Sequence, residues 1–219
     1  MLITIDQILG AEDLERVRAE VETLSFIDGK ATAGALAKTV KNNQQASGAA
    51  TEAVIEFLQR AIERHDVFQA AAQVKTYGPI LISRYQPGMA YGLHVDNAYM
   101  NGVRSDLSFT LFLSEPDSYD GGALCVEQAA GRQSIKLPAG SLVLYPSTSL
   151  HEVEPVTRGE RLAVVGWIES RVLSAEGREA LFDLAQVRAS LAHIPEVDPM
   201  VRLTLQKAEA NLIRLLSRS

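Results

Sequence analysis

The chain of 219 residues has one cysteine, one tryptophan, few aromatic residues and no long uninterrupted apolar run. The single cysteine, Cys125, excludes an intrachain disulfide framework and is typical of a reducing compartment. Without an apolar stretch of about 20 residues, no membrane-spanning helix is expected. The N-terminal segment carries Asp6 and no basic region, so we expect no secretory signal and a cytoplasmic location.

Positive charge is also scarce. Lysine and arginine number 21 against 27 acidic residues, which gives a formal net charge of -6. This balance argues against a general nucleic-acid partner or a membrane-surface partner, both of which select basic patches. Hydrophobic residues make up 47% and charged residues 22% of the chain, which is ordinary for a soluble globular protein with one core.

The first part of the chain, residues 1–73, is predicted to be a helical and loop region that packs on the core. Apolar residues recur at helical spacing over 11–24 and again over 50–65. Residues 26–50 are rich in Gly, Ala, Asn and Gln, which indicates a loop with at most one short strand. Within this stretch, Lys41–Gln45 could line the entrance to a site, although a solvated loop would have the same composition.

The periodicity changes to that of strands over residues 74–172. Turn signals such as Gln86-Pro87-Gly88 and Asp120-Gly121-Gly122 separate the apolar segments. The predicted strands are 79–86, 91–95, 106–113, 122–127, 133–137, 141–145, 151–154 and 161–168. Eight short strands with regular turns predict an antiparallel sandwich or jelly roll, and with the helices an α+β fold.

The last part of the chain, residues 173–219, is predicted to be a C-terminal helical hairpin. Segments 174–192 and 198–217 have apolar residues at helical spacing, and Ile194-Pro195 separates them. Their apolar stripe needs a cover, which is either the strand domain or a second subunit. A homodimer through these helices is therefore one expectation.

Two of the four histidines are assigned to structural roles. His65 lies at a helix end among charged residues and is expected on the solvated surface, and His193 is expected to cap a helix C-terminus. His94 and Asp96 are different, because two residues apart on a strand they point to the same face. We place Leu93 and Val95 on the opposite, buried face. An H-x-D pair alone would fit an exposed polar strand better than a site.

His151 extends this pair to a candidate metal site. It follows the hydrophobic strand 141–145 and a polar turn, so it could reach the mouth of a barrel next to His94 and Asp96, although a turn histidine with local partners is the alternative. Two histidines and one carboxylate are the ligand set that holds Fe(II) on one face and leaves the other positions open. The sequence therefore predicts a site for iron with open coordination positions.

Arg161 adds an anion site to this set. Alternation along 161–168 puts Arg161 on the same face as Trp167, with no carboxylate of its own segment on that face. An inward arginine needs an anion, and its planar guanidinium matches a carboxylate through two parallel hydrogen bonds. The alternative is a surface salt bridge with Glu160 or Glu154.

At these residues the chain resembles the Fe(II)/2-oxoglutarate-dependent dioxygenases, in particular the bacterial prolyl/lysyl-hydroxylase-domain (PKHD-type) hydroxylases. The matching segments are RYQPGMAYGLHVDNAYM, DLSFTLFLSEP, DGGALCV and LPAGSLVLYPSTSLHEVEPVTRGERLAVVGWIES. The upstream segment DGKATAGALAKTVKNNQQ is similar to the iron-uptake-associated branch of that family. The resemblance covers nearly the whole chain and implies a double-stranded β-helix, which is a jelly roll, between flanking N-terminal helices and the C-terminal hairpin.

The resemblance also implies roles for individual residues. It implies that His94, Asp96 and His151 bind iron and that Arg161 pairs with the distal carboxylate of 2-oxoglutarate. Tyr85 resembles a tyrosine that orients this co-substrate. A final group is implied to line the pocket: Tyr91, Leu111, Leu142 and Trp167.

The activity implied by the resemblance is hydroxylation of an unidentified substrate, with conversion of 2-oxoglutarate to succinate and CO2. L-ascorbate is the implied reductant that keeps iron ferrous. The substrate is either a small molecule linked to iron or siderophore uptake, or a protein side chain. Two alternatives remain: a cupin-type iron oxygenase without 2-oxoglutarate, against which Arg161 argues, and a non-catalytic module that senses iron or a 2-oxo acid.

Overall fold

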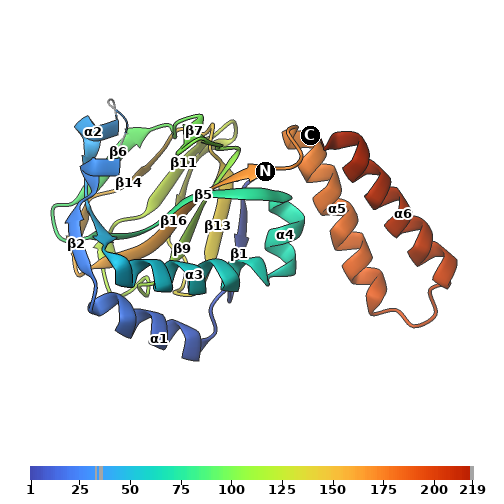
Figure 1. Ribbon diagram of the computed structural model, residues 1–219, viewed down its shortest axis with the longest axis horizontal. Coiled ribbons are helices and arrows are strands. Elements are labelled where there is room, and N and C mark those ends of the chain that lie inside the picture. Colours follow the sequence, from blue (N-terminus) through green and yellow to red (C-terminus); the bar gives the residue numbers. More distant parts are fainter. Residues whose placement is uncertain (33, 35–36, 218–219) are drawn as a thin grey trace.

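Two antiparallel β-sheets and a layer of helices form the body of the protein, and a helical hairpin projects from it (Figure 1). The computed structural model describes residues 1–32, 34 and 37–217. The helices are α1 (Ala11–Glu22), the 3-10 helix η1 (Gly29–Thr32), α2 (Ala37–Val40), α3 (Ala49–Glu63), α4 (Asp66–Ala72), α5 (Ala175–Ala192) and α6 (Pro199–Leu216). The four helices predicted from periodicity correspond to α1, α3, α5 and α6.

The larger sheet has the strand order β1-β13-β9-β16-β5-β4-β2. Its strands are β1 (Ile3–Ile5), β13 (Leu142–Pro146), β9 (Leu107–Phe112), β16 (Arg161–Ser170), β5 (Val74–Tyr85), β4 (Gln44–Ser47) and β2 (Ser25–Asp28). The smaller sheet has the order β12-β11-β14-β6-β3. Its strands are β12 (Gly131–Ile135), β11 (Leu124–Gln128), β14 (His151–Val153), β6 (Ala90–His94) and β3 (Lys41–Asn42).

Two short ribbons complete the strands. They pair β7 (Tyr99–Met100) with β8 (Val103–Arg104), and β10 (Asp120–Gly121) with β15 (Val156–Arg158). At the second ribbon, Gly121 has a φ of 69°, and a Cβ there would collide with the carbonyl oxygen of Pro155. Glycine is therefore needed for this close strand approach at the rim.

All eight predicted strands are present, and the antiparallel pairing confirms the jelly-roll and α+β predictions. The interpretation of residues 26–50 was wrong, because this stretch supplies β2, β3 and β4. These strands are polar, and they form because they pair with strands already in place: β4 adds to β5, and β3 adds to β6. Such pairing overrides a weak intrinsic preference for strand.

The main core lies between the larger sheet and the helices α1, α3 and α4. Helix α3 buries Val54, Leu58 and Ile62 on one face, and α1 buries Val17 and Val21. The sheet contributes the apolar side chains that alternate away from the smaller sheet. A second apolar cluster, which includes Phe112, Leu124 and Val156, lies between the two sheets. This arrangement leaves the interior between the sheets for polar side chains at one end.

The C-terminal hairpin is attached to the body through α5. Its buried residues Arg178, Leu181 and Ala185 lie on one face, and Arg178 donates hydrogen bonds to the carbonyls of Val172 and Leu173. An isolated β-bridge joins Val172 to Ser217 and ties the end of α6 back to this point. Helix α6 buries none of its residues. Figure 1 shows the hairpin (orange to red) extending away from the sheets.

Candidate active site

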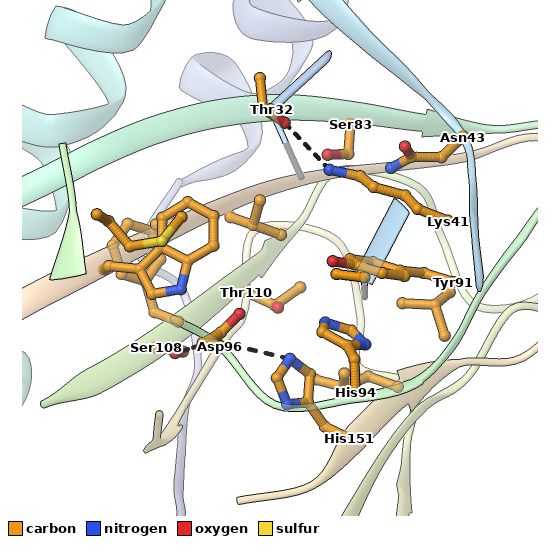
Figure 2. A pocket seen from close by; sticks show the side chains of 18 of the residues that line it. Thr32, Lys41, Asn43, Ser83, Tyr91, His94, Asp96, Ser108, Thr110 and His151 are labelled. Carbon is orange, nitrogen blue, oxygen red and sulfur yellow. Dashed lines mark hydrogen bonds and ion pairs between the residues drawn. The ribbon is translucent and has the colours of Figure 1, made fainter. Parts of the chain in front are cut away.

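Three side chains that are distant in sequence meet at one end of the space between the sheets. His94 ends β6 and His151 begins β14, and the two residues are directly paired in the antiparallel register. Asp96 follows β6. The candidate ligand atoms of these three residues all lie within 4.8 Å of one another. Figure 2 shows the three side chains converging on one point.

Both histidines are oriented by backbone carbonyls. The Nδ1 of His94 donates to the carbonyl of Gly92 at 2.8 Å, and the Nδ1 of His151 donates to that of Ser149 at 3.0 Å. These bonds leave each Nε2 free, and the Nε2 of His151 is 3.7 Å from Oδ2 of Asp96. Burial and the neighbouring His151 lower the pKa of His94 to about 4. His94 is therefore neutral near pH 7, which is the form that binds metals.

The carboxylate of Asp96 is held from the larger sheet. Ser108 Oγ donates to Asp96 Oδ2 at 2.6 Å and is 2.7 Å from Ser147 Oγ. The predicted shared face of His94 and Asp96 is thus the inner face, and the assignment of Leu93 and Val95 to a buried face was wrong. Their side chains are 48% and 49% exposed. The polar side chains of His94 and Asp96 face the interior, where the candidate ligand atoms converge.

Arg161 is a buried cation without a counter-ion among the described residues. It is 1% exposed, and none of its three guanidinium nitrogens has a hydrogen-bond partner in that part of the chain. Its guanidinium lies 5.2 Å from the ring centre of Tyr85 and 5.4 Å from that of Phe112. The alternative of a surface salt bridge with Glu160 or Glu154 was wrong, since these carboxylates bind other arginines.

One pocket brings the predicted residues together. It is lined by the triad, Arg161, Tyr85, Tyr91 and Trp167. Tyr85 pairs with Arg161 across β5 and β16, and burial raises its pKa while Arg161 lowers it. Tyr91 stacks on His94 with ring centres 3.6 Å apart. The Nε1 of Trp167 is buried without a hydrogen-bond partner in the described structure.

The prediction that Leu111 and Leu142 line the pocket was wrong. Both are fully buried in the main core, on the opposite side of the larger sheet from the pocket. They pair with each other across β9 and β13, and the polar side chains of β9 that line the pocket are Ser108 and Thr110. The period of two along β9 separates these polar side chains from the apolar ones.

A polar wall from the N-terminal region was only partly anticipated. Lys41, Asn43 and Gln45 alternate along β3 and β4, are all nearly fully buried and line the pocket. Burial lowers the pKa of Lys41 to about 8, while Asp96 and Asp28 raise it. The spacing of alternate polar residues in K-N-N-Q-Q was the signal that could have distinguished a strand from a solvated loop.

The other two histidines are not part of this cluster. His193 is the C-cap residue of α5, as predicted. His65 is the N-cap residue of α4 and is half-buried with its Nδ1 enclosed, so its assignment to the solvated surface was wrong.

The described helices include none that is long and apolar enough to cross a membrane.

The residues present fit both a metal ion and a 2-oxo diacid. Two imidazoles and a carboxylate are the ligand set of non-haem Fe(II) oxygenases, and their convergence leaves the remaining positions to the pocket. The unpaired guanidinium of Arg161 in the same pocket supplies a partner for a carboxylate. A metal site alone would not explain a buried arginine of this kind.

Comparison with known proteins agrees with this chemistry. Residues 80–169 match the profile of the 2OG-Fe(II) oxygenase superfamily. The chain is 48% identical over 220 residues to a PKHD-type hydroxylase of Acaryochloris marina, covering 98% of each chain. It is 49% identical over 223 residues to one of Hyphomonas neptunium, covering 99% of each. The chain is therefore a 2-oxoglutarate-dependent dioxygenase of the Fe(II) type, which argues against the non-catalytic and cupin-type alternatives.

Solved structures show the same fold. A prolyl-4-hydroxylase of Pseudomonas putida is 25% identical with a TM-score of 0.53, covering 78% of this chain and 92% of its own. A prolyl hydroxylase of Trichoplax adhaerens, in complex with a peptide fragment of hypoxia inducible factor, is 18% identical with a TM-score of 0.60, covering 82% and 86%. With relatives of nearly half identical sequence over the full length, the chain belongs to the PKHD-type hydroxylases of the 2OG-Fe(II) oxygenase superfamily.

Proposed function

We propose that the chain hydroxylates its substrate with conversion of 2-oxoglutarate to succinate and CO2, and that His94, Asp96 and His151 are the Fe(II) ligands. Arg161 binds the distal carboxylate of 2-oxoglutarate. The observation that carries this proposal is the unpaired, 1% exposed guanidinium in the same pocket as the triad. An unpaired charge at this depth is costly unless a ligand neutralises it.

Each residue has a definable task in this proposal. The backbone carbonyls of Gly92 and Ser149 fix both imidazoles with Nε2 toward the metal position. Ser108 fixes the Asp96 carboxylate. Bound Fe(II) would supply the O2 and 2-oxo-acid chemistry, and the protein supplies orientation and an enclosed site.

Tyr85 and Trp167 complete the co-substrate site in this proposal. Tyr85 lies opposite Arg161 in the sheet, so its side chain and the guanidinium can contact the same carboxylate. Trp167 closes the pocket on the β16 side, where its indole also excludes water. Exclusion of water strengthens the electrostatic interactions inside the pocket.

Succinate release from 2-oxoglutarate tests the assignment. The wild type is expected to release succinate only with Fe(II) and O2, and His94→Ala or Asp96→Ala is expected to abolish this release. Exposed His193→Ala is the matched histidine control and is expected to keep it. Full release by either ligand variant contradicts the assignment. If the Arg161→Ala variant consumes O2 in the absence of 2-oxoglutarate, this result would instead support a cupin-type iron oxygenase.

The substrate and the reductant are proposed more broadly. We propose a small molecule linked to iron or siderophore uptake, or a protein side chain, as substrate, L-ascorbate as the reductant, and the cytoplasm as the location. The support is the similarity of DGKATAGALAKTVKNNQQ to the iron-uptake-associated branch. Succinate release above the substrate-free rate, measured with catechol-type compounds and with prolyl and lysyl peptides, distinguishes the two substrate classes. Omission of ascorbate is expected to shorten the active period.

The division of the chain and its assembly are also proposals. Residues 74–172 form the dioxygenase unit, 1–73 support it, and 173–219 form an extension. The hairpin exposes Val201, Leu203 and Leu215, which favours a homodimer through these helices. Light scattering at micromolar concentration is expected to give twice the mass of the chain; a monomer mass contradicts the dimer but leaves the active-site assignment unaffected.

A further inference from the structure

The pocket contains a second buried cation that the iron and 2-oxoglutarate chemistry does not use. Lys41 is 5% exposed and lines the pocket from β3, directly opposite Tyr91 of β6. Its Nζ lies 5.1 Å from the ring centre of Tyr91, whose ring stacks on His94. In Figure 2, Tyr91 lies between Lys41 and His94. The ammonium group is therefore held in the same pocket as the candidate metal ligands, on the far side of Tyr91 from His94.

Among the described residues, the ammonium group of Lys41 has one hydrogen-bond partner. Nζ donates to Thr32 Oγ1 at 3.1 Å, and Thr32 in turn donates to Gln45 Oε1 at 2.7 Å. Within the described part of the chain, Lys41 forms no direct ion pair, and Asp96 and Asp28 act on its charge from a longer distance. An ammonium has three donors. Lys41 thus has donors that no acceptor among the described residues occupies.

The net charge of the pocket with a metal ion and 2-oxoglutarate bound indicates whether a further ligand is an anion or a cation. Asp96 is the only acidic side chain among the described residues that line the pocket, and Arg161 and Lys41 are the basic ones. A divalent metal and Arg161 together balance Asp96 and the two carboxylates of 2-oxoglutarate. Lys41 then adds one positive charge to the pocket, because Asp28, the other carboxylate that acts on it, does not line the pocket. A buried charge without a close counter-ion is costly.

We propose that Lys41 binds an anionic oxygen group of the substrate, such as a carboxylate, and thereby determines which substrates enter beside the iron. The proposal rests on the proposed function, because it assumes that 2-oxoglutarate occupies Arg161. The polar wall of β3 and β4 is then the substrate-recognition wall, and the triad and Arg161 form the opposite, reactive part of the pocket.

The test uses the intact chain loaded with Mn(II) and 2-oxoglutarate under argon, so that no turnover occurs. Benzoate and benzamide are the probes, because they differ in charge and little in shape. Calorimetry measures both affinities, and the fluorescence of Trp167, the single tryptophan, checks that the probe enters the pocket. A charge-assisted hydrogen bond predicts about tenfold tighter binding of benzoate by the wild type.

The variants separate this proposal from the proposed function. Lys41→Met is expected to lose the preference for benzoate and to keep Mn(II) and 2-oxoglutarate binding, whereas Lys41→Arg retains part of the preference. Lys38→Met, which removes an exposed lysine of α2, is the matched control and should match the wild type.

Three results overturn the role of Lys41. The wild type binds benzoate and benzamide with equal affinity, Lys41→Met keeps the wild-type preference for benzoate, or Lys41→Met loses as much affinity for 2-oxoglutarate as for benzoate. The last result would assign the ammonium to the co-substrate. Failure of the wild type to bind Mn(II) and 2-oxoglutarate would instead contradict the proposed function.

Discussion

Replacement of Arg161 by methionine is expected to have opposite effects on stability and on co-substrate binding. The side chain is 1% exposed and lies against Tyr85 and Phe112, and its guanidinium has no partner among the described residues. Methionine has a similar length and fills irregular apolar space. The change therefore removes an unpaired buried charge and keeps much of the packing.

The expected sizes of the two effects differ because Arg161 is unpaired in the ligand-free protein and paired when 2-oxoglutarate is bound. In the ligand-free protein, removal of the buried charge is expected to raise the free energy of unfolding by about 1–4 kcal/mol. In a chain of this length, that is a rise of at least about 2 °C in the melting temperature. With 2-oxoglutarate, the loss of one partner of a buried charge pair costs about 2–5 kcal/mol, which is a rise of about 30-fold or more in Kd.

Thermal unfolding and calorimetry of the Mn(II)-loaded protein measure the two effects. Arg158→Met is the matched control, because Arg158 is 61% exposed and pairs with Asp120 at the surface, and it should change neither quantity measurably. The reasoning is refuted if Arg161→Met lowers the melting temperature of the ligand-free protein and leaves the 2-oxoglutarate affinity unchanged. That combination would make Arg161 a structural residue.

Three further changes test other parts of the site and the fold. Ser108→Ala removes the 2.6 Å hydrogen bond to the ligand carboxylate and is expected to weaken Mn(II) binding about 10- to 100-fold in a metal titration, whereas exposed Ser118→Ala is not. Tyr85→Phe removes a hydroxyl beside the arginine and is expected to raise the KM for 2-oxoglutarate about fivefold, without a change in metal affinity. Leu58→Ala opens a cavity between α3 and the larger sheet and is expected to cost about 2–5 kcal/mol in chemical denaturation, whereas Glu56→Ala, on the exposed face, is not.

The strands and the reactive residues could be predicted because each depends on a local pattern. A period of two put His94 and Asp96 on one face, and an arginine on an apolar strand indicated an anion site. Whether that face points into the protein or toward solvent could not be predicted in the same way. Leu93 and Val95 are more apolar than their neighbours, so burial was assigned to them, although a binding pocket reverses the usual preference.

The polar strands show a second limit of the sequence. Residues Gln44–Ser47 form β4 because they hydrogen-bond to β5, a strand about 40 residues further along the chain. Their own composition is typical of a loop, so only the tertiary pairing reveals the strand. Lys41 lies in the adjacent β3 for the same reason. The residues that line the substrate side of the pocket were therefore the hardest to identify.

A titration of the metal-free chain with Mn(II), before and after addition of 2-oxoglutarate under argon, tests whether the triad and Arg161 form one site. We expect one metal ion per chain, and tight binding of 2-oxoglutarate only to the metal-loaded protein. We also expect that Asp96→Ala loses both. Unchanged metal stoichiometry and affinity in Asp96→Ala, or equal 2-oxoglutarate binding with and without metal, would contradict a site built from His94, Asp96, His151 and Arg161.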